Sequence, residues 1–281
     1  MKYRELYEYG TGRLKETGIE EASLDARLLL EEACGTNRND LLAHGDEPVA
    51  KEQSEAYFCF IEKRSRHIPL QHILGCQEFM GLRFKVTEDV LIPRQDTETL
   101  VEEVMRHLHD GMRILDLCTG SGCILLSLLR YSNHCQGIGS DLSEEALEIA
   151  KSNARSLGLE TEFIRSDLFE RITGKFEIIV SNPPYIPSGE IPGLMEEVRE
   201  HDPLMALDGG EDGLFFYKEI VAQAGDYLYP GGMLFFEIGC SQGEAVGRLM
   251  RQAGYQEVSV CQDLSGLDRV VSGVYGGENS V

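Results

Sequence analysis

Apolar residues recur at helical spacing over the first 66 or so residues, and no stretch there is typical of a strand. In EEASLDARLLLEEACG they return every three to four positions until Gly35, a residue that commonly ends a helix. KEQSEAYFCFIEKRSR has a similar face, and Pro69 ends that segment. This pattern predicts a small helical bundle over residues 1–70.

A short extended segment follows. QEFMGLRFKV, residues 77–86, is typical of two strands around Met80-Gly81, and therefore of a hairpin. A helix is expected next, with Asp96 as its N-cap. Its apolar face would comprise Leu100, Val101, Val104, Met105 and Leu108. We therefore expect a helical domain at 1–70, a β-hairpin linker at 71–95 and a larger domain at 96–281.

From residue 112 the pattern alternates between strands and helices. Strands are expected in MRILDLC, QGIGSDL, TEFIRSD, FEIIVSN and GMLFFEIG, and helices in GCILLSLLRY, SEEALEIAKSNARSLG, GLFFYKEIVAQAGDYL and SQGEAVGRLMRQAG. QEVSVCQDL and DRVVSGVYG can close the sheet as an antiparallel pair, and the final GGENSV is expected to fray. Such alternation predicts an α/β fold with a mainly parallel sheet and helices on both faces.

Composition narrows the classes of function. The 281 residues carry a formal net charge of −22, which disfavours general binding to DNA or RNA, because nucleic-acid binding needs Lys and Arg contacts to phosphate. No run of about 18 apolar residues exists, and MKYRELYEYG lacks an apolar signal region, so we expect a cytoplasmic protein without membrane attachment. None of the eight cysteines forms a CxxC pair, so reduced thiols and no metal site are expected.

A glycine-containing loop, LDLCTGSGC, stands between a predicted strand and a predicted helix. Gly120 and Gly122 let the backbone turn tightly and approach a ligand at the helix N-terminus. The spacing is not GxGxxG, because Leu125 stands where the third glycine would be, so pyrophosphate binding is weakly supported. A ligand-binding loop and an ordinary tight turn both remain open.

Two carboxylates follow the next strands. Asp141 ends a strand about 20 residues past the glycines, where it can accept hydrogen bonds from ribose hydroxyls. Asp167 follows the third strand and can accept from the exocyclic amine of a nucleobase. The alternatives are that Asp141 or Ser143 only caps the following helix, and that Asp167 is a turn residue. Convergence of all three strand ends favours one nucleoside site.

SNPPYIP interrupts the chain after the apolar strand FEIIV. The side-chain oxygen of Asn182 and the carbonyl of Pro183 are two acceptors that can hold the two N–H bonds of a planar NH2 group. Tyr185 offers a flat face to the same group. This arrangement favours positioning and electrostatic preorganisation without a strong base. The alternative is a rigid strand-to-loop turn with no chemistry.

LDLCTGSG, Asp141 and NPPY resemble class I S-adenosylmethionine-dependent methyltransferases that modify planar nitrogens. With PLQHILGCQEFMGLRF, VLIPRQDTETLVEEV and HDPLMALDGGEDGLFFY, essentially the whole chain resembles the release-factor glutamine methyltransferases of the HemK/PrmC type. The resemblance implies a Rossmann-like methyltransferase sheet with an N-terminal helical domain that reads the body of the substrate. It implies S-adenosylmethionine as methyl donor, S-adenosylhomocysteine as product, and N5-methylation of the Gly-Gly-Gln glutamine of class I release factors. A monomer without direct nucleic-acid contact is expected.

The resemblance also implies roles for individual residues. The methionine part of the cofactor would be held by Cys118, Thr119, Gly120, Ser121 and Gly122; ribose by Asp141; adenine by Asp167 and Leu168; and Asn182 would border the cofactor. The substrate glutamine would be held by Asn182, Pro183, Pro184 and Tyr185, of which Asn182, Pro183 and Tyr185 would be catalytic. Many members have Gly in place of Cys118, a change tolerated if its φ is negative, and an aromatic residue in place of Leu168.

Three other functions stay open. A ribosomal-protein glutamine methyltransferase shares Asn-Pro-Pro-Tyr, but its sequence after Ile-Pro-Arg typically differs from IPRQDTE. A DNA or RNA amino-methyltransferase would use the same residues, and the charge of −22 disfavours it. A binding module that has kept the fold is the third.

Two residues have roles that the sequence leaves open. Glu237 is either a neighbour that accepts the amide proton or a buried structural carboxylate, and a role for Arg94 in closing the pocket is left open.

Overall fold

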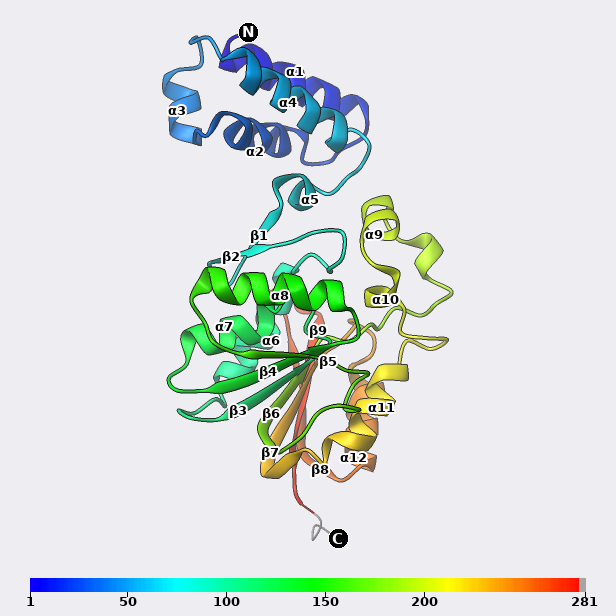
Figure 1. The fold of residues 1–281 in the computed structure, drawn as a ribbon. Coiled ribbons are helices and arrows are strands. Elements are labelled where there is room, and N and C mark those ends of the chain that lie inside the picture. The colour runs from blue at the N-terminus through cyan, green and yellow to red at the C-terminus, as the bar shows by residue number, and fades with distance from the viewer. Residues whose placement is uncertain (278–281) are drawn as a thin grey trace. The chain divides into compact units, whose positions relative to one another are not determined.

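A computed structural model describes residues 1–277 (Figure 1). Most of the segment expected to fray, residues 278–281, lies outside the described residues. The chain divides into two compact units. The first is Met1–Cys76 together with Met195–His201, and the second is Gln77–Leu194 together with the chain from Asp202 onward. None of the helices described between residues 1 and 277 is long and apolar enough to cross a membrane.

The first unit is helical, as the apolar spacing predicts. Its helices are α1 (Tyr3–Glu16), α2 (Ala22–Cys34), α3 (Arg38–Ala43), α4 (Lys51–Arg64), α5 (Leu70–Leu74) and α9 (Glu196–His201). Gly35 ends α2 in the left-handed conformation. The core is formed by aliphatic side chains from α1, α2 and α4 around the fully buried Tyr57.

A buried ion pair ties α9 into this helical unit. Arg64 of α4 donates from Nε to Asp25 Oδ2 at 2.7 Å, and its Nη2 lies 2.7 Å from Glu197 Oε1. Both Asp25 and Arg64 are buried. Removal of either partner would leave an uncompensated buried charge, which is strongly destabilising. Helix α9 was not predicted from the sequence, because its six residues, EEVREH, carry no apolar face.

The second unit contains a seven-stranded sheet in the order β5-β4-β3-β6-β7-β9-β8. The strands are β3 (Arg113–Leu117), β4 (Gln136–Asp141), β5 (Glu162–Arg165), β6 (Phe176–Ser181), β7 (Leu228–Glu237), β8 (Tyr255–Gln262) and β9 (Asp268–Tyr275). The first five run parallel, whereas β9 pairs antiparallel with both β7 and β8. The predicted parallel sheet with an antiparallel closing pair is confirmed.

Helices cover both faces of the sheet (Figure 1). They are α6 (Glu98–Met105), α7 (Cys123–Tyr131), α8 (Glu144–Leu157), α11 (Phe215–Ala224) and α12 (Gly243–Gln252). Because side chains alternate along a strand, Ile178 packs in the cluster with α6, α7 and α8, and its neighbour Ile179 packs in the cluster with α11 and α12. This two-faced burial explains why the central strands carry near-continuous apolar runs.

The predicted hairpin packs into the second unit. Strands β1 (Cys76–Phe79) and β2 (Leu82–Lys85) bury Phe79 and Phe84 against the cluster of α6 and α7. The expected N-cap role of Asp96 is wrong. A 3-10 turn, η1 (Gln95–Thr97), precedes α6, and the carboxylate of Asp96 instead lies 3.2 Å from the guanidinium of Arg269 on β9.

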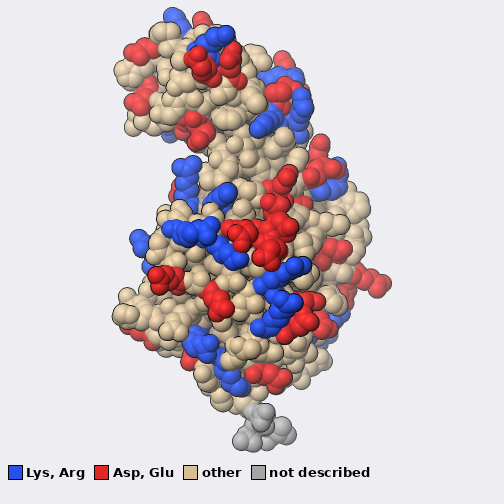
Figure 2. Space-filling model, viewed as in Figure 1, with Lys and Arg blue, Asp and Glu red and all other residues tan. Residues whose placement is uncertain are grey.

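Charged side chains on the face shown in Figure 2 are interspersed, with Lys and Arg beside Asp and Glu, so no broad basic surface forms there. This agrees with the overall excess of acidic residues.

The packing of α1 on α4 predicts opposite effects for two glycines of one helix. A Cβ at Gly10 would lie 1.9 Å from Tyr57 Oη, whereas a Cβ at Gly12 would meet nothing within 4 Å. We expect Gly10→Ala to lower the free energy of unfolding by about 1–3 kcal/mol through overpacking. Gly12→Ala, the matched control, should be neutral or stabilise by up to about 1 kcal/mol. Urea denaturation measures both, and equal effects of the two substitutions would contradict this packing.

Candidate active site

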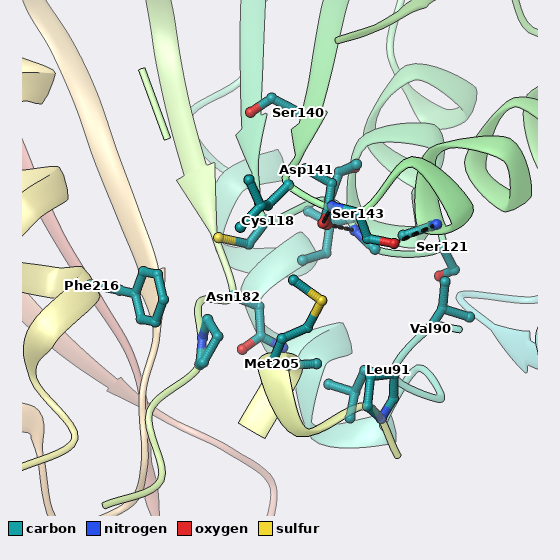
Figure 3. Close-up of a pocket in the computed structure, with 18 of the residues that line it drawn as sticks. Val90, Leu91, Cys118, Ser121, Ser140, Asp141, Ser143, Asn182, Met205 and Phe216 are labelled. Carbon is teal, nitrogen blue, oxygen red and sulfur yellow. Dashed lines mark hydrogen bonds between the residues drawn. The ribbon is translucent and has the colours of Figure 1, made fainter. Parts of the chain in front are cut away.

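A cavity of about 360 Å³ lies in the second unit (Figure 3). It opens where the strand order reverses: from β3 the chain continues to β4 and β5 on one side and then crosses to β6 on the other. Ligands of open parallel sheets bind at such a switch point, outside the carboxyl ends of the strands. Nine of the sequence-predicted site residues line the cavity: Cys118, Thr119, Gly120, Ser121, Asp141, Asp167, Leu168, Asn182 and Pro184. Gly122, Pro183 and Tyr185 are adjacent to lining residues in the chain.

A buried carboxyl group, that of Asp116, fixes the position of the glycine loop through a hydrogen bond. Thr119 donates its hydroxyl to Asp116 Oδ2 at 2.6 Å, and its amide donates to Ser140 O on β4. Asp116 is fully buried in β3, and burial raises its pKa to about 7. Gly122 is the N-cap of α7, with φ +79°. A Cβ there would lie 3.2 Å from Ala150 Cβ, so glycine lets the loop and α8 approach closely.

Cys118 does not have the negative φ that would let a cysteine replace the glycine common in the family. Its φ is +58°, so this non-glycine residue occupies the left-handed region. That conformation costs an L-residue roughly 1–2 kcal/mol. The condition of a negative φ, under which cysteine would replace glycine without strain, is therefore not met, because the chain turns sharply between the end of β3 and the N-terminus of α7. Burial raises the pKa of the Cys118 thiol, which keeps it protonated inside the cavity.

Asp141 supports the loop and also faces the cavity. Its Oδ2 accepts a hydrogen bond from the amide of Gly120 at 2.9 Å, and its Oδ1 accepts one from the amide of Ser143 at 3.0 Å. Ser143 is the true N-cap of α8, since its hydroxyl accepts from the amide of Ala146. The capping role therefore belongs to Ser143, and a ribose-binding role for Asp141 stays a prediction. Burial raises the pKa of Asp141, and each carboxylate oxygen keeps a further lone pair for a ligand.

The Asn-Pro-Pro-Tyr segment leaves β6 beside this loop. The parallel register places Ser181 opposite Leu117, and the hydroxyl of Ser181 donates to Leu117 O at 2.8 Å. Strands β3 and β6 are therefore neighbours in the sheet, so the segment and the glycine loop begin side by side. Asn182 lines the cavity while Pro183 is buried. The carbonyl of Tyr185 accepts from Gln242 Nε2 at 3.0 Å, and burial raises the pKa of Tyr185 to about 12.

Two further segments line the cavity and were not assigned to the site from the sequence. One is the stretch before η1, with Val90, Leu91, Pro93 and Arg94, together with Thr97 of η1, and the other runs from Pro203 to Phe216. Arg94 of the first segment forms an ion pair with Asp202, next to the second, at 2.5 Å. Met205 and Phe216 face the same space as Asn182 (Figure 3). The available signal in the sequence was a pair of aromatic residues, Phe215 and Phe216, shortly after a glycine-rich segment.

Glu237 ends β7 and is not among the residues that line the cavity. It is buried, and burial raises its pKa to about 7, opposed by hydrogen bonding to Thr97 and by the positive charge of Arg269. Within residues 1–277 no group of three or more His, Cys, Asp or Glu side chains could hold a metal ion. All eight cysteines are free.

Comparison with known proteins identifies two matching family models. Residues 5–75 match the PrmC N-terminal domain, and residues 95–197 match the methyltransferase small domain. Among curated proteins, a release factor glutamine methyltransferase of Geobacter sulfurreducens is 42% identical over 274 residues, covering 97% of this chain and 96% of its own. One from Clostridium acetobutylicum is 38% identical over 271 residues, covering 94% and 95%.

Solved structures show the same fold at low identity. A methyltransferase of Pyrococcus furiosus is 18% identical, has a TM-score of 0.54, and the match covers 71% of this chain and 91% of that one. A T. thermophilus 16S rRNA N2 G1207 methyltransferase, solved in complex with AdoMet and guanosine, is 18% identical with a TM-score of 0.51. That match covers 71% of this chain and 49% of the other.

The buried carboxyl of Asp116 predicts a pH-dependent stability. Its pKa is about 7 in the folded protein and near 3.8 when unfolded. Between these values the unfolded chain loses this proton while the folded protein keeps it. The contribution of Asp116 to the free energy of unfolding is therefore fully present below about pH 4 and is lost as the pH rises through 7. Asp116→Asn removes this dependence and keeps an acceptor for Thr119, so the variant should gain stability relative to wild type over that interval.

Urea denaturation of both proteins at pH 4, 5.5, 7 and 8 measures that difference. Other buried carboxyls, including Glu237, contribute equally to both proteins and cancel. A difference that stayed constant from pH 4 to 8 would show that Asp116 ionises at its ordinary pKa.

Proposed function

Because this chain belongs to the family of release factor glutamine methyltransferases, we propose that it transfers a methyl group from S-adenosylmethionine to N5 of the glutamine in the Gly-Gly-Gln motif of class I release factors. The main observation behind this proposal is that the residues assigned to the substrate and those assigned to the cofactor line one cavity. The side chain of Asn182 faces the same cavity as the glycine loop and Asp141 (Figure 3). A planar nitrogen held there would be next to a bound cofactor.

The residues present fit the cofactor. Gly120 has φ +53°, and a Cβ at this position would meet no atom within 4 Å, so a ligand can approach the backbone. The free lone pairs of Asp141 suit ribose hydroxyls, and Asp167 suits an exocyclic amine. Leu168 takes the place of the aromatic residue common in the family, and Phe216 lines the same cavity with an aromatic ring. We assign Phe216 to the adenine or substrate wall.

S-adenosylmethionine, when bound, supplies an electrophilic methyl group and leaves as S-adenosylhomocysteine. Asn182 Oδ1 and the carbonyl of Pro183 accept the two N–H bonds of the substrate amide, which fixes its plane and favours positive charge on its nitrogen. Pro183 and Pro184 keep these acceptors rigid, because neither ring allows φ to change. Tyr185 stays protonated, since burial raises its pKa to about 12, and it packs beside the acceptor as an uncharged ring.

The rival functions have less support. The relatives described above are named for release factors, which disfavours a ribosomal-protein substrate. The net charge of −22 and the interspersed charges in Figure 2 disfavour a nucleic-acid substrate.

The helical segment 1–70 is assigned to recognition of the body of the release factor, residues 71–95 to a hairpin linker and residues 96–281 to methyl transfer. We assign to the protein the role of a monomer that acts in the cytoplasm, where release factors work.

A labelled-methyl assay tests the acceptor. We expect purified enzyme to label a class I release factor and to leave unlabelled the same factor with its Gly-Gly-Gln glutamine changed to alanine. Duplex DNA should also remain unlabelled, because the enzyme lacks a basic tracking surface on the face shown in Figure 2. Label on the alanine variant or on DNA would refute the proposed acceptor.

Two substitutions should impair different steps, one methyl transfer and the other cofactor binding. Asn182→Ala removes one of the two acceptors for the amide, so methyl transfer should fall by roughly 100-fold or more while cofactor affinity is kept. Asp141→Ala removes the ribose partner and a support of the loop, so cofactor affinity should fall. Calorimetry measures binding and the labelled-methyl assay measures turnover. Near-wild-type turnover of Asn182→Ala, or unchanged cofactor affinity of Asp141→Ala, would remove that residue from its assigned role.

A further inference from the structure

Glu237 and Asn182 occupy equivalent places at the ends of neighbouring strands. Strands β6 and β7 run parallel, with Ser181 opposite Phe236. Asn182 and Glu237 each follow that pair by one residue, and neighbouring strands lie about 4.8 Å apart. The side chain of Asn182 faces the cavity, whereas Glu237 is 2% exposed and does not line it. The carboxyl therefore stands behind the amide, away from any ligand.

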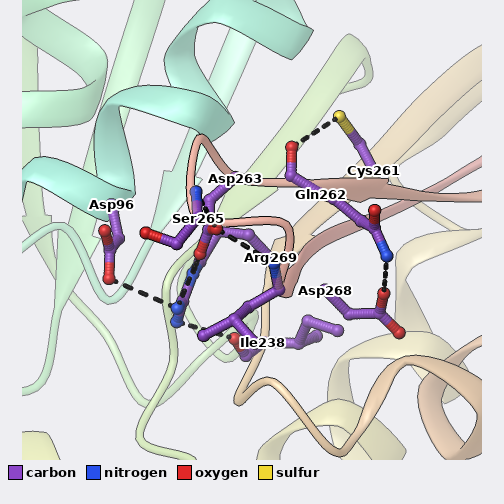
Figure 4. Close-up of polar contacts among 9 residues, drawn as sticks. Asp96, Ile238, Cys261, Gln262, Asp263, Ser265, Asp268 and Arg269 are labelled. Carbon is purple, nitrogen blue, oxygen red and sulfur yellow. Dashed lines mark hydrogen bonds and ion pairs between the residues drawn. The ribbon is translucent and has the colours of Figure 1, made fainter.

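Charged and polar groups from several elements surround this carboxyl. Hydrogen bonding from Thr97, the charge of Arg269 and hydrogen bonding from Asn182 favour its ionised form, in decreasing order, and the charge of Asp96 opposes it. Arg269 is itself fixed by Asp263 and Asp96 and donates to the carbonyl of Ile238, next to Glu237 (Figure 4). Oε2 of Glu237 accepts no hydrogen bond within the described chain, so its capacity for donors is not exhausted.

We propose that Glu237 is a positioning residue, whose carboxylate selects the orientation of the Asn182 amide in which Nδ2 points to Glu237 and Oδ1 points to the substrate. The proposal rests on the proposed role of Asn182. An ionised carboxylate can only accept hydrogen bonds, so it holds the NH2 end of the asparagine. The substrate amide nitrogen presents only N–H donors, so it needs the oxygen end. By accepting from Asn182 Nδ2, the carboxylate of Glu237 thus keeps Asn182 Oδ1 turned toward the substrate.

Protonation of Glu237 would reverse this preference. A neutral carboxyl can donate to Asn182 Oδ1, which turns the amide and presents two N–H groups to the N–H groups of the substrate. Burial holds the pKa of Glu237 at about 7, inside the working range of a cytoplasmic enzyme. Three other titratable side chains face it: Tyr185, Tyr217 and Cys123. Burial raises the pKa of each, to about 12 for Tyr185 and Cys123, so they stay neutral near pH 7.

The test measures kcat/KM for methyl transfer to a Gly-Gly-Gln-containing release factor between pH 5.5 and 9. For wild type we expect a rise through an apparent pKa near 7, a measurement that needs no substitution. Glu237→Gln should be slower by about tenfold or more at pH 8, with a flat profile, and should keep the cofactor affinity of wild type. Glu177→Gln is the matched control, because Glu177 lies on β6, which leads into the Asn-Pro-Pro-Tyr segment (the acceptor segment), and its carboxylate accepts from the amide of Arg113. It should keep the wild-type rate and profile.

A double-substitution cycle separates positioning from proton transfer. If Glu237 acts only through Asn182, the Asn182→Ala/Glu237→Gln enzyme should be no slower than Asn182→Ala alone. A further loss of about tenfold in the double variant would make Glu237 a direct proton acceptor and overturn the proposal. A wild-type rate for Glu237→Gln, or a flat wild-type profile, would overturn it as well. Near-wild-type activity of Asn182→Ala would instead refute the proposed function of the acceptor segment, a separate outcome.

Discussion

The in-register parallel pairing of β3 with β6 is the constraint on which the site depends. It brings Leu117 and Ser181 side by side, and the hydroxyl of Ser181 closes the pair on the carbonyl of Leu117. Two parts of the site begin within a few residues of this point: the glycine loop follows β3, and Asn-Pro-Pro-Tyr follows β6. A shift of the register by one residue would turn every side chain of β6 to the opposite face. Such a shift would also break the hydrogen bond from the Ser181 hydroxyl to the carbonyl of Leu117.

The site is built from carboxyl groups that burial has made less acidic. Burial raises the pKa of Asp116, Asp141 and Glu237, and each supports another part of the site: Thr119, the amide of Gly120 and the amide of Asn182. A carboxylate is a strong acceptor, and its desolvation is compensated here by hydrogen bonds and, for Glu237, by Arg269. Under the proposed mechanism this preorganisation requires no strong base, since the planar amide nitrogen would be held and polarised rather than deprotonated beforehand.

Much of the architecture could be predicted from the sequence because it depends on local patterns. Helical spacing in the first 66 residues and alternation after residue 112 predict the elements, and the handedness and burial rules for parallel strands then place their carboxyl ends together. Asp141 and the Asn-Pro-Pro-Tyr segment were recognisable for the same reason, since Asp141 ends a predicted strand and the segment directly follows one. The match of relatives over more than nine-tenths of the chain agrees with that interpretation.

Other features were decided only by the tertiary structure. Asp96 has the residue type and position of an N-cap, yet it pairs with Arg269, which lies far along the chain on β9. The positive φ of Cys118 results from the closure of the loop between β3 and α7, and a thiol gives no local sign of it. The pairing of Arg94 with Asp202, the place of Phe216 in the cavity and the position of Glu237 behind Asn182 all join distant segments. The sequence by itself therefore determined the elements and the acceptor motif, because periodicity and turn chemistry act between near neighbours. The orientation and charge of the groups that serve the motif depend on burial and on long-range contacts, which exist only once the sheet has formed.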